Sequence, residues 1–266
     1  MRPVAGTRPI CSQLSSGDGA AVLVTDFQAL NGDRRLSELL GDAADGERVY
    51  QVDPRGAVSG DRLYADLPAL ADEAAAIFRS SESSAVTDQR VFVVSHCSAA
   101  GVSLRIAGQL AGAREVTAIL VEPTWPGTED VIGRFAEFQG KLGAGRPCPD
   151  LGGDPWSCVA GMEQLMREDL TAMAKRVGLD SVPPAFSELL AAYRTWLAYL
   201  LACSNDLPAK PPSDAVEITV LSREPDFIVP GTAAGRCRIT PPPPGDEPDA
   251  VTPDLVKLLL EQIRSD

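Results

Sequence analysis

One cysteine, Cys97, stands where the sequence changes from a strand pattern to a helix pattern. The apolar run Val91–Val94 predicts a buried strand, and apolar residues at helical spacing follow from Ala99. A nucleophile between a strand and a helix that approach closely needs small residues two positions before and after it, as Ser95 and Ala99 are. We call residues 95–99 the Cys97 turn. Its pattern predicts a thiol nucleophile for carbonyl chemistry, the alternative being a small, buried, unreactive cysteine.

The single histidine of the chain, His96, directly precedes Cys97. We expect the turn to direct the His96 side chain away from the thiol, which leaves it a local packing or hydrogen-bonding role. A serine without a base would be nearly inert, whereas a thiol is already partly ionised near neutral pH. The N-terminus of the following helix lowers the pKa of such a thiol further. Cys97 can therefore react even without a histidine base.

The lack of a base histidine should affect acylation of Cys97 less than hydrolysis of the acyl-enzyme. Attack of a thiolate on a thioester is close to an even exchange, while hydrolysis of the resulting acyl-enzyme needs a water activated by a base. We therefore expect Cys97 to accept an acyl or aminoacyl group and to pass it to a thiol or an amine, or to let a substrate amine close on it. Rapid hydrolysis would contradict this scheme.

Four acidic residues are candidates to act with Cys97. Glu122 and Asp226 each follow a predicted strand, and Asp246 and Glu247 lie in a proline-rich loop before the last predicted helix. A carboxylate beside a thiol raises the pKa of the thiol, so these acids help only as proton acceptors with a raised pKa or as partners of a substrate ammonium group. We expect Glu122 and Asp226 in catalysis and Asp246 and Glu247 in substrate binding; the alternative is that each is simply solvated.

A sheet and helices are needed to hold the Cys97 turn, and the remaining sequence contains both patterns. Strand-like runs alternate with amphipathic segments, which favours a parallel sheet covered by helices. Strands are expected at residues 20–25 (the first), 48–52, 91–94, 116–121 and 216–221, and helices at 35–40, 66–80, 99–111 and 253–263. The whole chain, residues 1–266, is expected to form one α/β domain.

No strand-like run is present between residues 127 and 210. Amphipathic segments near 128–142, 157–177 and 185–203 instead predict a helical insertion, 127–210, which we interpret as a lid; the alternative is plain helical packing. Trp125, beside this insertion, is expected to bind substrate. Other aromatic residues nearby could line an acyl pocket or, more commonly, belong to the core: Phe135, Phe138, Trp156 and Trp196.

The Cys97 turn, Ser-His-Cys-Ser-Ala, resembles the Gly-His-Ser-x-Gly nucleophile turn of α/β-hydrolase thioesterases, with cysteine in place of serine. Residues 49–56, 119–124 and 220–226 are similar in order and spacing to neighbouring strands of carrier-protein thioesterases. The resemblance covers most of the chain. It implies an α/β-hydrolase fold, a mainly parallel sheet flanked by helices with a helical lid insertion. Two glycines and the nucleophile differ, and Pro243–Pro248 stands where the family has its base histidine.

The same resemblance implies a substrate and an oxyanion hole. The substrate would be a small molecule, an acyl or aminoacyl group held as a phosphopantetheine thioester on an acyl or peptidyl carrier protein, in natural-product (antibiotic) biosynthesis. No cofactor is expected on the chain itself. The oxyanion donors would be the backbone N–H of Ser98 and one from the loop after the first strand, near Phe27 or Gln28. Cysteine-bearing relatives shuttle acyl groups in nonribosomal peptide pathways.

Composition argues against several other functions. A formal net charge of −13 at pH 7 disfavours nucleic-acid binding, which rests on Lys and Arg displacing counterions. Six scattered cysteines and one histidine show no metal-ligand spacing, and GxxxxGKS and GxGxxG patterns are absent. No apolar run approaches the roughly 20 residues of a membrane helix, and no signal-peptide pattern is present. We expect a cytoplasmic protein without a metal or a membrane partner.

Two other functions stay open at this point. The chain could be a non-catalytic hydrolase-fold protein that binds a ligand or a partner, and the missing base histidine favours this. It could also be a cyclase or isomerase that uses its carboxylates without a covalent intermediate. Activity that survives replacement of Cys97 by alanine would separate the last possibility from acyl transfer.

Overall fold

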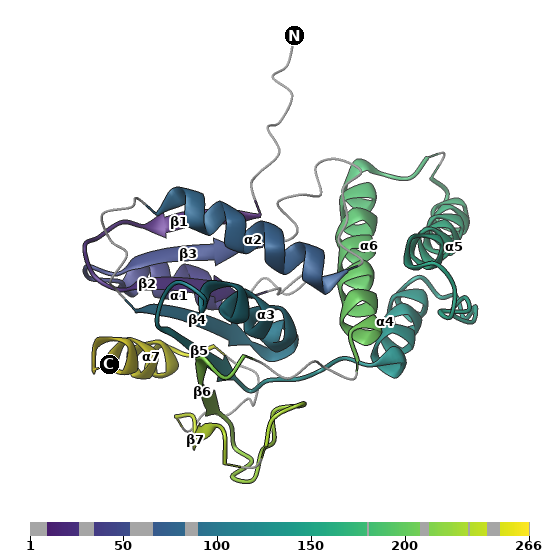
Figure 1. The fold of residues 1–266 in the computed structure, drawn as a ribbon. Helices are drawn as coiled ribbons and strands as arrows, with labels where there is room; N and C mark the ends of the chain where they lie inside the picture. Colours follow the sequence, from purple (N-terminus) through teal and green to yellow (C-terminus); the bar gives the residue numbers. More distant parts are fainter. Residues whose placement is uncertain are drawn as a thin grey trace.

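The computed structural model describes residues 10–26, 35–53, 66–82, 90–179, 181–207, 213–233, 235–243 and 251–265. Seven strands form one sheet in the order β1-β3-β2-β4-β5-β6-β7 (Figure 1). Only the β1–β3 pair is antiparallel, and every other pair is parallel. The strands are β1 (Cys11–Ser15), β2 (Ala21–Thr25), β3 (Arg48–Val52), β4 (Val91–His96), β5 (Val116–Val121), β6 (Val216–Leu221) and β7 (Arg238–Thr240).

The central strands are apolar because both of their faces are covered. Every residue of β2, β4 and β5 is buried, as expected for parallel strands between two helical layers. In register, Thr25 lies opposite Ser95, and His96 lies opposite Val121. The carboxyl ends of these strands therefore meet at one edge of the sheet, where β4 runs on to the Cys97 turn.

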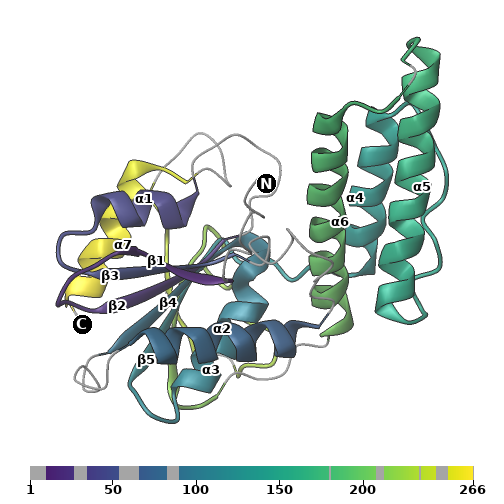
Figure 2. The same ribbon diagram turned by 90° about the horizontal axis from the view of Figure 1, so that it is seen from above.

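Helices cover both faces of the sheet (Figure 2). One face carries α1 (Leu36–Ala43) and α7 (Pro253–Ser265), and the other carries α2 (Leu67–Ser81) and α3 (Ala100–Leu110). The predicted mixed α/β fold class, a mainly parallel sheet flanked by helices, is confirmed. The predicted central strands and flanking helices are all present.

Three further helices, α4 (Thr128–Lys141), α5 (Pro155–Arg176) and α6 (Pro184–Asn205), form a group beside the sheet, which we call the three-helix unit (Figures 1 and 2). The unit has an apolar cluster of its own, which contains Phe135 and Phe138. The C-terminal half of α6 instead reaches the sheet core, where Tyr199 and Cys203 pack. Arg105 of α3 pairs with Asp206, just after α6, through an Nε–Oδ2 hydrogen bond of 2.9 Å.

Two strands were missed by the sequence prediction, and residues 20–25 are not the first strand of the chain. β1 has the sequence CSQLS with a mixed burial pattern, and β7 is only three residues long and half exposed. Both lie at the edges of the sheet. An edge strand is short and partly solvated, so it needs no apolar run that a sequence pattern could reveal.

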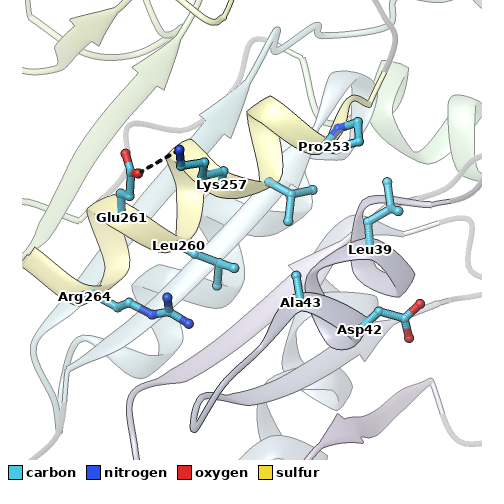
Figure 3. A pocket seen from close by; sticks show the side chains of 9 residues that line it. Leu39, Asp42, Ala43, Pro253, Lys257, Leu260, Glu261 and Arg264 are labelled. Carbon is cyan, nitrogen blue, oxygen red and sulfur yellow. Dashed lines mark ion pairs between the residues drawn. The ribbon is translucent and has the colours of Figure 1, made fainter.

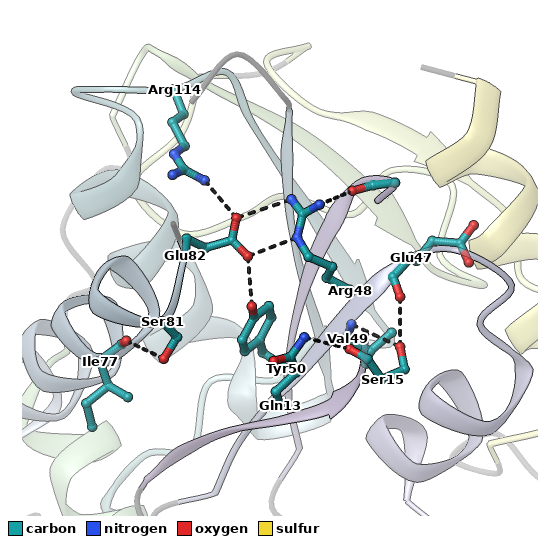
Figure 4. A network of polar contacts seen from close by, with 11 residues as sticks. Gln13, Ser15, Glu47, Arg48, Val49, Tyr50, Ile77, Ser81, Glu82 and Arg114 are labelled. Carbon is teal, nitrogen blue, oxygen red and sulfur yellow. Dashed lines mark hydrogen bonds and ion pairs between the residues drawn. The ribbon is translucent and has the colours of Figure 1, made fainter. Parts of the chain in front are cut away.

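A buried polar network joins α2 to β3 at the amino ends of the strands, the sheet edge opposite the Cys97 turn (Figure 4). Arg48 donates from Nε to Glu82 Oε1 over 3.0 Å, and the Tyr50 hydroxyl donates to the same oxygen over 2.8 Å. Arg114 donates to Glu82 Oε2 over 3.5 Å. The Glu82 side chain is 2% exposed, so these donors replace the water that it gives up on folding.

Within the described ranges, no helix is both long and apolar enough to cross a bilayer. Among the same residues no group of three or more His, Cys, Asp or Glu side chains is gathered in a way that could hold a metal ion.

Candidate active site around Cys97

Cys97 begins a short 3-10 turn, Cys97–Ala99, between β4 and α3. Its φ of 50° lies in the left-handed region that non-glycine residues rarely adopt. Ser95 and Ala99 are both fully buried, which fits the need for small residues where β4 meets α3. The thiol itself is half-buried. A half-buried thiol on a left-handed backbone at a strand end has the local geometry expected of a nucleophile turn.

His96 contacts the thiol, so the expectation that its side chain turns away from Cys97 is wrong. His96 is the last residue of β4 and is 7% exposed. Its Nε2 atom lies 3.5 Å from Cys97 Sγ. The left-handed backbone at Cys97 turns the chain sharply directly after His96, and the two neighbouring side chains stay within hydrogen-bonding distance. The single imidazole of the chain therefore belongs to the site.

Glu122 lies at the end of the neighbouring strand. It follows Val121, the residue opposite His96, and its φ of 41° is also left-handed. In the part of the chain that the structure describes, Cys97 and Glu122 are the only non-glycine residues with positive φ. The Glu122 side chain is 19% exposed, and its Oε1 lies 3.7 Å from Arg223 Nε. Two strained residues, one a thiol and one an acid, thus end adjacent strands.

The loop after β5 is fixed to the Cys97 turn. The backbone N–H of Thr124 donates to the carbonyl oxygen of Cys97 over 3.1 Å. The next residue, Trp125, stacks on Phe227 from the loop after β6, with ring centroids 5.9 Å apart. A side chain added at Gly101 would begin 3.9 Å from the Trp125 indole nitrogen. The predicted binding residue Trp125 therefore lies over the first turn of α3, and its neighbour Thr124 is bonded to the Cys97 turn.

The indole N–H of Trp125 is buried and has no hydrogen-bond acceptor among the described residues. Buried donors are normally paired, because an unpaired one loses its water without replacement. An acceptor on a substrate would satisfy this group.

Asp226, the second predicted catalytic acid, is placed differently. Its side chain is exposed and makes no hydrogen bond or ion pair with any described residue. It lines a hollow of about 270 Å³ in the loop after β6, together with Phe227 and Cys237. The structure brings Glu122 to the strand ends but leaves Asp226 at the surface.

Of the predicted oxyanion donors, only Ser98 is described. It is the second residue of the Cys97–Ala99 turn, and the first N–H groups of a helical segment have no partner within it. Its carbonyl oxygen accepts a 2.6 Å hydrogen bond from the Tyr199 hydroxyl of α6. Phe27, Gln28, Asp246 and Glu247 lie outside the described residues.

Sequence reasoning missed Asp26, which directly follows β2, one residue beyond the pair Thr25 and Ser95. Its carboxylate is 2% exposed and accepts hydrogen bonds from the Ser37 backbone N–H over 2.7 Å and the Ser37 hydroxyl over 3.1 Å. Burial raises the pKa of Asp26, and the Ser37 hydrogen bonds offset this only in part. Asp26 thus anchors the first turn of α1. An acid directly after a predicted buried strand was the available signal.

Hollows elsewhere in the described chain do not contain the nucleophile. A groove of about 470 Å³ runs between α1 and α7, where Leu39 and Ala43 face Leu260 (Figure 3). Another, of about 590 Å³, lies in the three-helix unit next to Cys148. Neither is lined by Cys97, so the site is identified by its chemistry rather than by cavity volume.

No protein-family model matches the chain. No curated protein matches it in sequence. Solved structures do: the Vlm2 thioesterase domain bound to a dodecadepsipeptide is 15% identical with a TM-score of 0.56, over 96% of this chain and 98% of that one. The NocB thioesterase domain from the nocardicin cluster is 19% identical with a TM-score of 0.53, over 96% and 99% of the two chains.

Two further structures are similar. RedJ, a thioesterase from the prodiginine pathway of Streptomyces coelicolor, is 19% identical with a TM-score of 0.51, over 100% of this chain and 97% of that one. A four-domain nonribosomal peptide synthetase, AB3403, is 14% identical with a TM-score of 0.58; the match covers 96% of this chain and 20% of the synthetase. At these identities the likeness shows the fold, which is that of α/β-hydrolase thioesterase domains.

Proposed function

We propose that this chain is a thioesterase-like acyl or aminoacyl transferase that works through an acyl-enzyme on Cys97. The observation that carries the proposal is the half-buried Cys97 thiol on a left-handed backbone at the carboxyl end of a central strand. The similar structures include thioesterase domains of nonribosomal peptide and other natural-product pathways, which supports a carrier-bound substrate. The donor would be a phosphopantetheine thioester on an acyl or peptidyl carrier protein.

The first half-reaction forms the acyl-enzyme. The Cys97 thiolate bonds to the thioester carbonyl carbon, the C–S bond to pantetheine breaks, and the pantetheine thiolate leaves and takes up a proton. Negative charge that develops on the carbonyl oxygen would be stabilised by the Ser98 N–H and a second donor from the loop near Phe27 and Gln28. The Tyr199 hydrogen bond to the Ser98 carbonyl fixes the peptide group after Ser98, next to that donor.

The second half-reaction transfers the acyl group. An amine or thiol of the acceptor attacks the acyl carbon, the bond to Cys97 Sγ breaks, and the acceptor loses its proton. Hydrolysis by the same route uses water, which attacks a thioester more slowly than a thiol or an amine does whether or not a base assists. Transfer or cyclisation is therefore the favoured outcome.

Two features fit an aminoacyl or peptidyl substrate. The stacked pair Trp125 and Phe227 provides an apolar wall beside the nucleophile, and the buried Trp125 N–H can donate to a substrate carbonyl. Glu122 provides a carboxylate for a substrate ammonium group, although it shares its charge with Arg223. The acid near Cys97 is thus assigned to binding rather than to activation of the thiol.

The test is intact-protein mass spectrometry after exposure to a panel of acyl and aminoacyl pantetheine thioesters. Wild type should gain the mass of the acyl group and hold it, while Cys97→Ala should gain none. In Glu122→Gln we expect slower acylation by aminoacyl thioesters and unchanged acylation by plain acyl thioesters. Glu224→Gln, an exposed acid on the loop after β6, is the matched control for both.

Two results would overturn the proposal. Absence of both adduct and turnover across a broad panel would favour a non-catalytic binding protein. Turnover that persists in Cys97→Ala would place the chemistry on the carboxylates without a covalent intermediate.

A further inference from the structure

We infer that His96 and Cys97, two consecutive residues, form a catalytic dyad in which the imidazole carries the proton of the thiol. The catalytic part of this inference rests on the proposed function; the dyad itself does not. The Nε2–Sγ distance of 3.5 Å fits a hydrogen bond to sulfur, a larger atom than oxygen or nitrogen. In the dyad, the imidazolium N–H donates to a thiolate, the pairing that activates cysteine nucleophiles.

The position of His96 protects such a pair from water. The imidazole is 7% exposed, whereas the thiol is half-buried and so remains open to a substrate. Val94, two residues earlier on β4, packs in the apolar cluster on the α1 and α7 face of the sheet. Because side chains alternate along a strand, His96 points to this same face. A charge pair shielded on one side is screened less than one at the surface.

Charged groups of both signs lie at the strand ends next to His96. Asp26 and Glu122 end the strands on either side of β4, each one residue beyond a residue paired with β4. Two cations offset these acids: Arg35, whose charge acts on Asp26, and Arg223, after β6, through its ion pair with Glu122. A carboxylate near a histidine favours the charged form of the imidazole, so Asp26, when ionised, supports the imidazolium, whereas the ion pair with Arg223 offsets the charge of Glu122.

The only titratable group that reaches the Cys97 turn from the three-helix unit through a described hydrogen bond is Tyr199. Burial raises the pKa of the Tyr199 phenol well above its ordinary value. Its hydroxyl therefore stays protonated and donates to the Ser98 carbonyl at working pH. It adds no charge that would compete with the dyad.

The dyad completes the proton balance of the proposed reaction. The thiolate forms the C–S bond of the acyl-enzyme, and the imidazolium gives its proton to the departing pantetheine thiolate. The neutral imidazole then accepts the proton of the attacking amine or thiol as that group takes the acyl chain from Sγ. The thiolate and the imidazolium are regenerated without any other co-reactant.

The first test uses NMR titration of the imidazole, whose signal needs no assignment because the chain has one histidine. The protein should carry no histidine tag. A thiolate partner raises the pKa of His96, so the imidazole of Cys97→Ala should titrate at least about one pH unit lower than that of wild type. Equal midpoints in the two proteins would overturn the dyad.

The second test follows alkylation of Cys97 by iodoacetamide against pH, with peptide mass spectrometry to isolate the Cys97 signal. At pH 6.5 wild type should react at least about tenfold faster than His96→Gln, and the gap should close near pH 9 because an unassisted thiol ionises there. Cys148 and Cys237 are half-buried cysteines of the same chain and serve as internal controls. Each should react at the same rate in wild type and in His96→Gln. Superimposable Cys97 profiles would overturn the dyad.

The two tests keep the dyad separate from the proposed function. A low NMR midpoint in Cys97→Ala with no acyl adduct in wild type would retain the dyad and reject acyl transfer. Acyl adducts with equal NMR midpoints would retain acyl transfer and reject the dyad. If His96→Gln fails to fold, the comparison of wild type with Cys97→Ala still decides.

Discussion

At the residue scale, the conformation of Cys97 is as informative as its chemistry. A left-handed backbone costs an L-residue about 1–2 kcal/mol, and Cys97 adopts it at the point where the thiol has to leave the sheet. Strain of this kind persists when the surrounding structure imposes it, here through β4, α3 and the hydrogen bond from Thr124 to the Cys97 carbonyl. The strained backbone at Cys97 therefore lowers the stability of the fold while it holds the thiol at the end of β4.

This strain predicts that glycine is more stabilising than alanine at position 97, the reverse of the order at an ordinary helix position. At position 97, relief of about 1–2 kcal/mol of strain exceeds the entropic cost of glycine, about 0.5–1 kcal/mol. Cys97→Gly should therefore unfold in urea with a free energy about 0.5–1 kcal/mol above that of Cys97→Ala. At the exposed position 136 in α4, Ala136→Gly should instead lose about 1 kcal/mol. The same order at both positions would show that Cys97 is not strained.

The sequence could single out Cys97 as a candidate nucleophile, but it did not predict the contact of Cys97 with His96. A cysteine between small residues at a strand-to-helix change is a local pattern, and it is visible in the residues 95–99 alone. The contact of His96 with Cys97 goes with a left-handed backbone at Cys97, a conformation that the residue types alone do not predict. Family resemblance pointed the other way, because the expected base lies near the last helix in relatives. The left-handed backbone at Cys97 accompanies a His96 side chain that contacts the thiol instead of turning away from it.

At the element scale, α6 is the helix that joins the three-helix unit to the active site. Its Tyr199 hydroxyl binds the Ser98 carbonyl, and Asp206 at its end pairs with Arg105 of α3. Both contacts are part-buried, so they resist screening by solvent better than surface pairs. Movement of the three-helix unit as one body would have to break both contacts.

Removal of the Tyr199 hydroxyl should destabilise the protein measurably. Tyr199→Phe leaves the Ser98 carbonyl without this donor, and we expect a loss of about 1 kcal/mol in the free energy of unfolding. Tyr193→Phe is the matched control, because its hydroxyl only meets the exposed Lys141 ammonium over 3.0 Å. That variant should lose less than about 0.5 kcal/mol. Equal losses of unfolding free energy in urea titrations would mean that the hydrogen bond to Ser98 stabilises the fold no more than the exposed contact of Tyr193 does.

The elements themselves were largely predictable, and their long-range contacts were not. The ends of α4, α5 and α6 fall within about two residues of the positions expected from apolar periodicity. β1 and β7 were missed because edge strands carry no such signal. Tyr199 reaches a residue 101 positions away in the sequence. A contact of that separation depends on how the three-helix unit packs on α3, which local patterns do not encode.

At the scale of the whole molecule, the sheet has one reactive edge and one structural edge. Cys97, His96 and Glu122 gather at the carboxyl ends of the strands, while the Glu82 network lies at the amino ends (Figure 4). Burial alone would raise the pKa of Glu82, but the hydrogen bonds from Arg48, Tyr50 and Arg114 outweigh it and lower the pKa below its ordinary value. The acid thus stays ionised in the folded protein.

The lowered pKa of Glu82 fixes how stability should depend on pH. Because the folded state holds Glu82 ionised more tightly than the unfolded state does, its contribution is complete above the unfolded carboxyl pKa of about 4.3. That contribution is lost as the pH falls through the lower, folded value. Glu82→Gln also leaves the Arg48 guanidinium, 9% exposed, without its carboxylate. Breaking a buried pair in this way costs about 3–5 kcal/mol at neutral pH.

Urea unfolding of wild type and Glu82→Gln between pH 7 and pH 3 tests this directly. The difference in unfolding free energy should be largest from pH 7 down to about 5 and should shrink below about pH 4.3, where wild type begins to lose the same charge. Glu137→Gln is the control: hydrogen bonds from Lys141 and Arg134 lower the pKa of that acid too, but the pairs are exposed. Its difference should stay below about 1 kcal/mol throughout. A large Glu82→Gln deficit that is constant with pH would mean that shape, not charge, holds α2 to β3.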